Sequence, residues 1–150
     1  MLIEALIEVI SSFFVGVSFA LMFRTKKKRL LLCGVAAAFG WGIYCVAEAL
    51  INGIFMQYFL GAAAVTLYAE IMARITKTPA VVYLLPGLIP AVPGGSLYYT
   101  TFALVTGDQA GVAMHGRATG LAALGIAFGL VVISVVVHCY YEIKMGKRAV

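Results

Sequence analysis

Residues 79–107 read PAVVYLLPGLIPAVPGGSLYYTTFALVTG, an apolar run interrupted by prolines and glycines. Each proline removes a backbone N–H donor and clashes with the preceding turn, so a continuous helix is not expected through this segment. In hydrocarbon, each backbone carbonyl freed in this way costs several kcal/mol unless protein or water satisfies it. We therefore expect the break to line a protein-enclosed or water-filled path, as in a transporter or channel, and not to belong to a simple membrane anchor.

The whole chain is apolar. It has 150 residues, of which 63% are hydrophobic and 11% charged, and its mean hydropathy is +1.04. A soluble domain of this length could not bury so much apolar surface, so the sequence predicts an all-α integral membrane protein with a single membrane domain. Five segments are long enough for a bilayer core, which takes about 20 residues. They are residues 2–23, 30–50, 54–72, 79–107 (the broken segment) and 120–141.

The basic residues predict the orientation of these spans. With five crossings, ten of the eleven Lys and Arg fall on one side of the membrane and only Arg117 on the other. The positive-inside rule then places the N-terminus outside and the C-terminus in the cytoplasm of a multi-pass plasma (inner) membrane protein. A re-entrant hairpin at residues 79–107 would change the division to eight against three, so five crossings are favoured. The net charge of +5 therefore needs no nucleic-acid partner to explain it.

The break is also where a substrate is expected. A half-helix is predicted to begin at Pro93-Gly94-Gly95 with Ser96 near its N-cap, and its first amides carry the positive end of the helix dipole. Such an end, pointed into the protein near the middle of the membrane, can hold a carboxylate. The alternative is a kink that only shapes helix packing. The predicted path residues are Pro86, Gly87, Pro90, Pro93, Gly94, Gly95, Ser96, Tyr98, Thr100 and Thr101.

Two ionisable residues within the spans are candidates for proton coupling. Glu70 lies four residues before Arg74, the helical spacing of an ion pair, so a structural pair and a role in coupling are both open. His138, near the end of the fifth span, could carry a proton or be a satisfied interfacial histidine. Glu4 and Glu8 share one helical face near the outer surface, where they are either solvated or part of an outer vestibule.

Other chemistry is not indicated. The cysteines Cys33, Cys45 and Cys139 are expected to be small packing residues, because the first two lie roughly 18 Å apart along one helix and cannot bridge each other. The sequence has no HExxH, GxxxxGK[ST] or CxxC pattern and no plausibly spaced Ser/His/Asp set. We therefore predict that the protein is not an enzyme and has no catalytic residues, metal site or cofactor.

Residues 77–100, KTPAVVYLLPGLIPAVPGGSLYYT, resemble the signature of the threonine/serine exporter family. That signature has a Lys-Thr-Pro lead, a Pro-Gly, a Pro-x-x-Pro-Gly-Gly and then a tyrosine. The likeness continues through SFALMF at 18–23, GWGIY at 40–44 and AEIMAR at 69–74, so it covers most of the chain. A basic residue often follows the motif tyrosine in the family, and here Tyr99 stands in its place. The matching positions are Lys77, Thr78, Pro79, Pro86, Gly87, Pro90, Pro93, Gly94, Gly95 and Tyr98.

The resemblance implies secondary export of small amino acids such as threonine and serine, driven by the proton motive force. Split forms of the family are associated with dicarboxylates such as succinate. The long form carries two membrane halves, which split forms place on two chains. This chain resembles the smaller, C-terminal half and lacks the hydrolase-like region of the larger one.

A partner is expected on physical grounds as well, because five spans are few to enclose a path. The charge bias argues against an antiparallel homodimer. A parallel homo-oligomer, a complex with the larger half on a separate chain, or both remain open. The rival function is a non-transporting scaffold that assembles or stabilises a partner, with the broken span as its docking surface.

Overall fold

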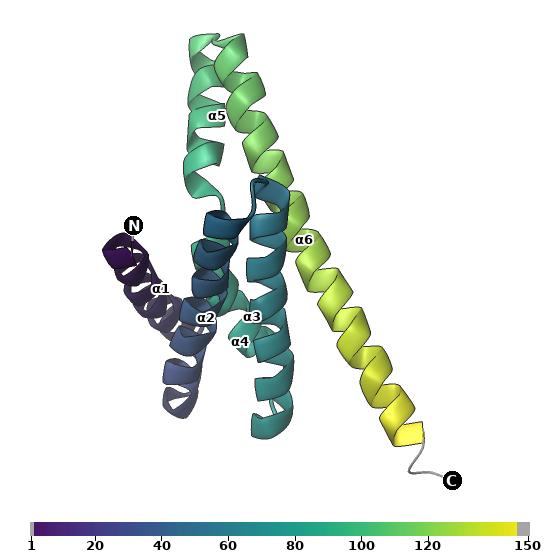
Figure 1. Ribbon diagram of the computed structural model, residues 1–150. Helices are drawn as coiled ribbons and strands as arrows, with labels where there is room; N and C mark the ends of the chain where they lie inside the picture. The colour runs from purple at the N-terminus through teal and green to yellow at the C-terminus, as the bar shows by residue number, and fades with distance from the viewer. Residues whose placement is uncertain (1, 147–150) are drawn as a thin grey trace.

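The structure, a computed structural model, describes residues 2–146, and every element in that range is a helix. Figure 1 shows the chain from its N-terminus to the end of the last helix. The elements are, in chain order, α1 (Leu2–Met22), the 3₁₀ turn η1 (Lys27–Arg29), α2 (Leu30–Leu50), α3 (Ile54–Thr76), α4 (Val81–Leu88), the 3₁₀ turn η2 (Ile89–Ala91), α5 (Gly94–Thr106) and α6 (Gln109–Gly146).

Four of these helices, α1, α2, α3 and α6, are long and apolar enough to cross a membrane. The pair formed by α4/η2 and α5 is bent by 54° and adds a fifth crossing if it counts as one span. The predicted fold class, an all-α membrane protein whose fourth span is broken, is therefore confirmed.

Helices α1 to α4 form the body of the molecule, in which α2 packs against α1, α3 and α4. Helix α4 is its most enclosed element, with Tyr83, Pro86 and Gly87 all buried. The Tyr83 hydroxyl donates to Thr76 Oγ1 at 2.9 Å, which ties α4 to the end of α3. A Cβ on Gly87 would lie 2.7 Å from a methyl carbon of Val65, so only glycine allows α4 to approach α3 this closely.

Helix α4 passes through Pro86 without breaking, so the break expected in residues 79–107 does not occur at this proline. Proline at this position has no N–H to donate to the carbonyl of Val82, four residues earlier. The Cys33 thiol, fully buried on α2, donates to that carbonyl at a sulfur–oxygen distance of 3.4 Å. Cys33 was expected to be only a packing residue, and its hydrogen bond corrects that expectation.

Replacing Cys33 tests this bond. Cys33→Ala leaves the buried Val82 carbonyl without a donor and should lower the free energy of unfolding by about 1 kcal/mol or more. Cys33→Ser keeps a donor at the same place and should lose less. Thermal unfolding of the full chain in detergent measures the difference, with Cys139→Ala, at an exposed position, as the control. Equal stability of the alanine and serine variants would show that the bond contributes nothing.

Helix α6 is the longest element. Its 38 residues extend about 57 Å at 1.5 Å per residue, against about 35 Å for the 23 residues of α3. Asp108 caps its N-terminus, since Asp108 Oδ1 accepts the Gly111 N–H at 3.0 Å. The segment after this cap is not a separate helix. It runs without interruption into the predicted fifth span, so α6 begins at Gln109 and not near residue 120.

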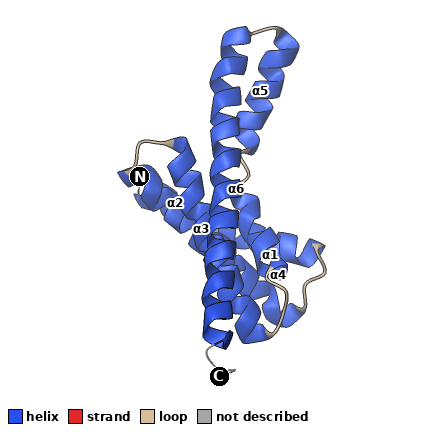
Figure 2. Ribbon diagram, turned by 90° about the vertical axis from the view of Figure 1, so that its right-hand side faces the viewer, coloured by secondary structure: helices blue, strands red, loops and turns tan. Residues whose placement is uncertain are grey.

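The extra length of α6 forms a projecting hairpin with α5. Helix α5 packs against the first third of α6 and makes no extensive contact with α1, α2 or α3. Figures 1 and 2 show this hairpin standing clear of α1 to α4, beyond the ends of α2 and α3 that their short connection joins. We call α5 and residues 109–120 of α6 the arm.

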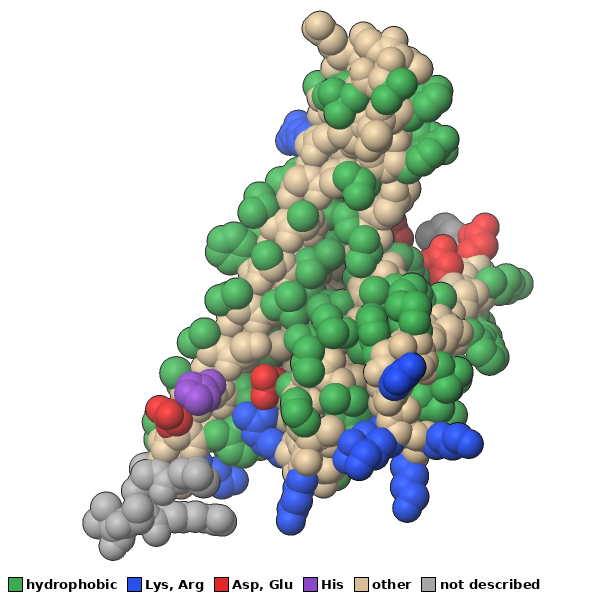
Figure 3. Space-filling model, turned by 180° about the vertical axis from the view of Figure 1, so that it is seen from behind, with side chains coloured by type: hydrophobic (Ala, Val, Ile, Leu, Met, Phe, Trp, Pro, Cys, Tyr) green, Lys and Arg blue, Asp and Glu red, His purple; other side chains and the backbone are tan. Residues whose placement is uncertain are grey.

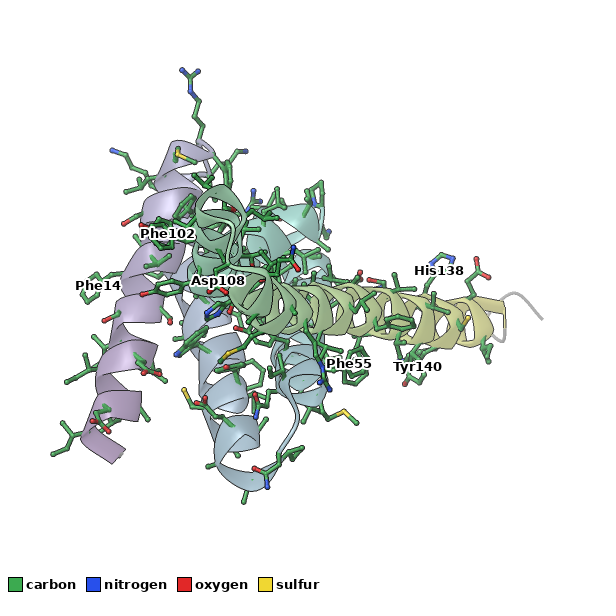
Figure 4. All side chains as sticks on the ribbon, turned by 90° about the horizontal axis from the view of Figure 1, so that it is seen from above. Phe14, Phe55, Phe102, Asp108, His138 and Tyr140 are labelled. Carbon is green, nitrogen blue, oxygen red and sulfur yellow. The ribbon has the colours of Figure 1, made fainter. Side chains whose placement is uncertain are left out.

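Two glycines allow α3 and α6 to pack along their length. A Cβ on Gly125 would lie 2.5 Å from the Phe55 carbonyl oxygen, and one on Gly129 would lie 2.7 Å from the Phe59 carbonyl oxygen. Figure 4 shows Phe55 beside α6. The two glycines form a GxxxG pattern, GIAFG, which lets membrane helices approach closely.

Gly129→Leu should therefore separate α3 from α6, at a cost of about 1–3 kcal/mol or more from overpacking. Gly120→Leu, on the same helix, serves as the matched control, because a Cβ at position 120 would meet no heavy atom within 4 Å. The measurement is the unfolding midpoint of each purified variant. An unchanged midpoint for Gly129→Leu would contradict the packing described here.

The basic side chains are segregated along the bundle. In Figure 3, the described Lys and Arg side chains gather at one end, apart from one on the arm side, whereas acidic side chains lie at both ends of the body. The basic end contains the α1–α2 turn and the last turns of α3 and α6. Lys147 and Arg148, which belong to the predicted cytoplasmic cluster, lie outside the described residues.

Candidate functional site

The break between α4 and α5 has a defined backbone geometry. Val92 is extended, and Pro93 has φ −76° and ψ 58°, while the Gly94 N–H donates to the Val92 carbonyl at 2.7 Å. These angles and this bond define an inverse γ-turn centred on Pro93. Helix α5 begins at Gly94, where the half-helix was predicted to begin. Its N-cap is Pro93, and Ser96 is its third residue and not its cap.

The N-terminus of α5 is open. Within the described residues, no acceptor bonds the N–H groups of Gly95 and Ser96. Both Gly94 and Gly95 are exposed, and a Cβ on either would meet no heavy atom within 4 Å. Among the described residues, the start of α5 is therefore open on the side of these two glycines.

The hydroxyl groups after the break are used within α5. Thr100 Oγ1 donates to the Ser96 carbonyl at 2.7 Å, and Thr101 Oγ1 donates to the Leu97 carbonyl at 3.0 Å. Tyr98 is exposed and stacks on Phe102, which points away from α6 (Figure 4). One face of α5 thus packs on α6 and the other is uncovered.

The predicted path residues therefore fall into two groups. Pro86 and Gly87 are buried in the body between α2 and α3, and Pro90 is half-buried in η2. Those from Gly94 to Thr101 lie on α5, where most are exposed. None of the four cavities described for residues 2–146 is lined by residues of both groups.

The two candidates for proton coupling lie close together. Glu70 forms the predicted ion pair with Arg74, at 2.6 Å between Glu70 Oε2 and Arg74 Nη1. Glu70 and His138 line one cavity of about 340 Å³ between α3 and α6. A second cavity of about 710 Å³ shares Arg74 and His138 with the first. We call the two cavities together the Arg74 groove, and its polar lining consists of Glu70, Arg74, Ser134, His138, Tyr141 and Glu142.

Sequence reasoning missed two residues of this groove. The Arg74 guanidinium carbon lies 4.0 Å from the centroid of the Tyr141 ring, a cation–π contact between α3 and α6. Glu142 Oε1 lies 3.4 Å from His138 Nε2, one helical turn away. The spacing of four between His138 and Glu142 was a local signal for that pair. No local signal could place Tyr141 over Arg74, because they lie on different helices.

A second polar cluster lies at the opposite end of the body. Glu4, Glu8 and Glu48 line a cavity of about 510 Å³ between α1 and α2. Glu8 Oε2 accepts the Trp41 indole N–H at 3.2 Å and the Cys45 thiol at 3.6 Å. Both alternatives stated for Glu4 and Glu8, solvated carboxylates and an outer vestibule, are compatible with this geometry.

In the part of the chain that the structure describes, no three His, Cys, Asp or Glu side chains come together to hold a metal ion. What the chain offers is a broken helix pair with an open helix end, a mixed-charge groove at the basic end and several apolar spans. These features define a multi-pass membrane protein of the transporter type.

Comparison with protein families identifies the family to which the chain belongs. The family model described as Threonine/Serine exporter, ThrE, matches residues 8–136, which is most of the chain. The chain belongs to this family, and the resemblance found in the sequence is confirmed. The family is one of membrane exporters and not a known class of enzymes. No match was found among curated proteins or solved structures.

Proposed function

We propose that this chain is the membrane subunit of a proton-coupled secondary exporter of small amino acids (threonine and serine) or small carboxylates such as succinate. It works with a larger exporter half carried on a separate chain. The N-terminus lies outside and the C-terminus in the cytoplasm of the plasma (inner) membrane, since the basic residues gather at one end of the bundle.

The open N-terminus of α5 carries this proposal. Two unpaired N–H groups at a helix start, Gly95 and Ser96, together with the helix dipole, favour a bound carboxylate. Transporters place such half-helix ends at their substrate sites. The substrates considered all carry a carboxylate, and the glycines leave room for it to approach the backbone.

The arm supports the need for a partner. Its outer face exposes large apolar side chains, of which Val105 is 83% and Tyr98 64% exposed. These side chains lie beyond the body of the molecule, where an apolar patch suits contact with another protein chain or with lipid. We propose that the larger half covers this face and completes the path at the α5 N-terminus.

Glu70 and His138 are the proposed proton-coupling residues, because both line the Arg74 groove at the cytoplasmic end. A histidine and a carboxylate in one water-accessible groove can exchange protons with the cytoplasm.

Counterflow in proteoliposomes tests the function. The full chain is reconstituted with and without the larger half, and exchange of labelled serine, threonine and succinate is measured. We expect exchange only when both chains are present, because the α5 end is uncovered in this chain alone. Exchange by this chain alone would contradict the need for the larger half. A stable complex without exchange of any solute would instead support the scaffold function.

Bulky residues at the α5 N-terminus should abolish export. Gly94→Leu with Gly95→Leu blocks the approach of a carboxylate, and the Cβ atom of either new residue would meet no described heavy atom within 4 Å. We therefore expect counterflow to fall to background while membrane insertion and thermal stability stay unchanged. Gly120→Leu, at another open glycine, is the control. Wild-type counterflow in the double variant would contradict a substrate site at this end.

A further inference from the structure

The Arg74 groove lies at the end of the bundle where α3 and α6 separate. Figure 1 shows the last turns of α6 leaning away from α3. The close contacts at Gly125 and Gly129 hold α3 and α6 together earlier in α6. The groove opens on the C-terminal side of these contacts. Its lining residues come from the last two turns of α3 and from α6 after Ser134.

Arg74 is held in place with part of its guanidinium unused. Its Nη1 donates to the Glu70 carboxylate and to the Glu70 carbonyl, both at 2.6 Å, and its guanidinium lies on the Tyr141 ring. Within the described residues, its Nε and Nη2 groups make no hydrogen bond. The side chain is 33% exposed. A guanidinium fixed in this way presents donors in the geometry that a carboxylate accepts.

The residues of α6 that line the groove supply groups that could bind the rest of an amino acid whose carboxylate is held by Arg74. Glu142 is 73% exposed, and His138 is its only ion-pair partner among the described residues, so its carboxylate is available to an ammonium group. The Ser134 hydroxyl makes no hydrogen bond among the described residues and lines the same groove. A cation and an anion on facing walls match the two charges of an α-amino acid.

The charge of the groove separates the two substrate classes. Its lining has one arginine and two glutamates, so its net charge is −1 with His138 neutral and 0 with His138 protonated. Lys144 is not one of the lining residues, and its ammonium lies 5.9 Å from the centroid of the Tyr140 ring. Figure 4 shows Tyr140 and His138 pointing to opposite sides of α6. A dicarboxylate would bring two negative charges to a groove with one available cation, whereas a zwitterion adds none.

We infer that the Arg74 groove is a cytoplasmic loading site for zwitterionic amino acids, with Arg74 binding the carboxylate and Glu142 binding the ammonium group. This inference rests on the proposed export function and adds to it a second site and a preference for serine and threonine over succinate. The Glu70 and Tyr141 contacts position Arg74.

Binding to the purified full chain tests the inference without requiring transport. Affinities for labelled serine, threonine and succinate are measured for the wild type and for Arg74→Gln, Glu142→Gln and Glu142→Lys. We expect the wild type to prefer serine and threonine, and Arg74→Gln to weaken their binding by about 10- to 100-fold. Glu142→Lys should invert the preference toward succinate, because it replaces the ammonium partner with a second cation.

The inverted preference of Glu142→Lys is the decisive readout. Residues that only held α3 and α6 together would not change which solute binds more tightly. Glu142 is well exposed, so its replacement should leave the fold intact even if Arg74→Gln loosens α6. Lys144→Glu, on the opposite side of α6, is the control for general surface charge and should leave the preference unchanged. A shift with Lys144→Glu as large as that with Glu142→Lys would overturn the inference.

Transport assays separate this inference from the proposed function. In the reconstituted complex, the KM for serine measured from the cytoplasmic side should rise in Glu142→Lys, while the KM from the outer side stays the same. Unchanged binding and KM in all groove variants, with active counterflow, would overturn the groove and leave the exporter function standing. Absence of counterflow in the wild type would overturn the exporter function. Serine binding to the wild type would still show whether the Arg74 groove is an amino-acid site.

Discussion

Every backbone carbonyl in a low-dielectric interior needs a donor, and the four prolines of this chain concentrate that requirement around α4 and its junction with α5. At Pro86, the thiol of Cys33 supplies the missing donor from a neighbouring helix. At Pro93, the chain forms an inverse γ-turn and changes direction. The first solution keeps α4 helical and buried in the body. The second separates η2 from α5 and leaves α5 to start with unpaired amides, which makes this helix end suitable for an anionic group.

Close backbone approaches decide where the remaining helices lie. Gly87 allows α4 to pack closely against α3, and Gly125 and Gly129 allow α6 to pack closely along the opposite side of α3. Helix α3 therefore contacts both the body helices α2 and α4 and the long helix α6. Because α6 is much longer than α3, the same packing that fixes its middle leaves both of its ends free: one forms the arm with α5, and the other leans away to open the Arg74 groove.

The two ends of the molecule consequently offer different chemistry. The arm end has an open helix N-terminus and an uncovered apolar face, both suited to completion by another chain. The basic end has a groove in which positive and negative side chains already face each other. The proposed export function requires uptake of substrate from the cytoplasm before release outside, and the two proposed sites, the Arg74 groove at one end and the α5 N-terminus toward the other, fit that order.

Local rules explain what could be predicted from the sequence. Hydropathy placed the spans, proline chemistry placed the break at Pro93, and the spacing of four between Glu70 and Arg74 gave their ion pair. The tertiary structure alone decided which groups meet across helices. Cys33 and Val82 are 49 residues apart, and Arg74 reaches Tyr141 only because α3 and α6 pack side by side. It also decided that the α5 end is open, because the exposure of a helix terminus depends on its neighbours in space and not on its own residues.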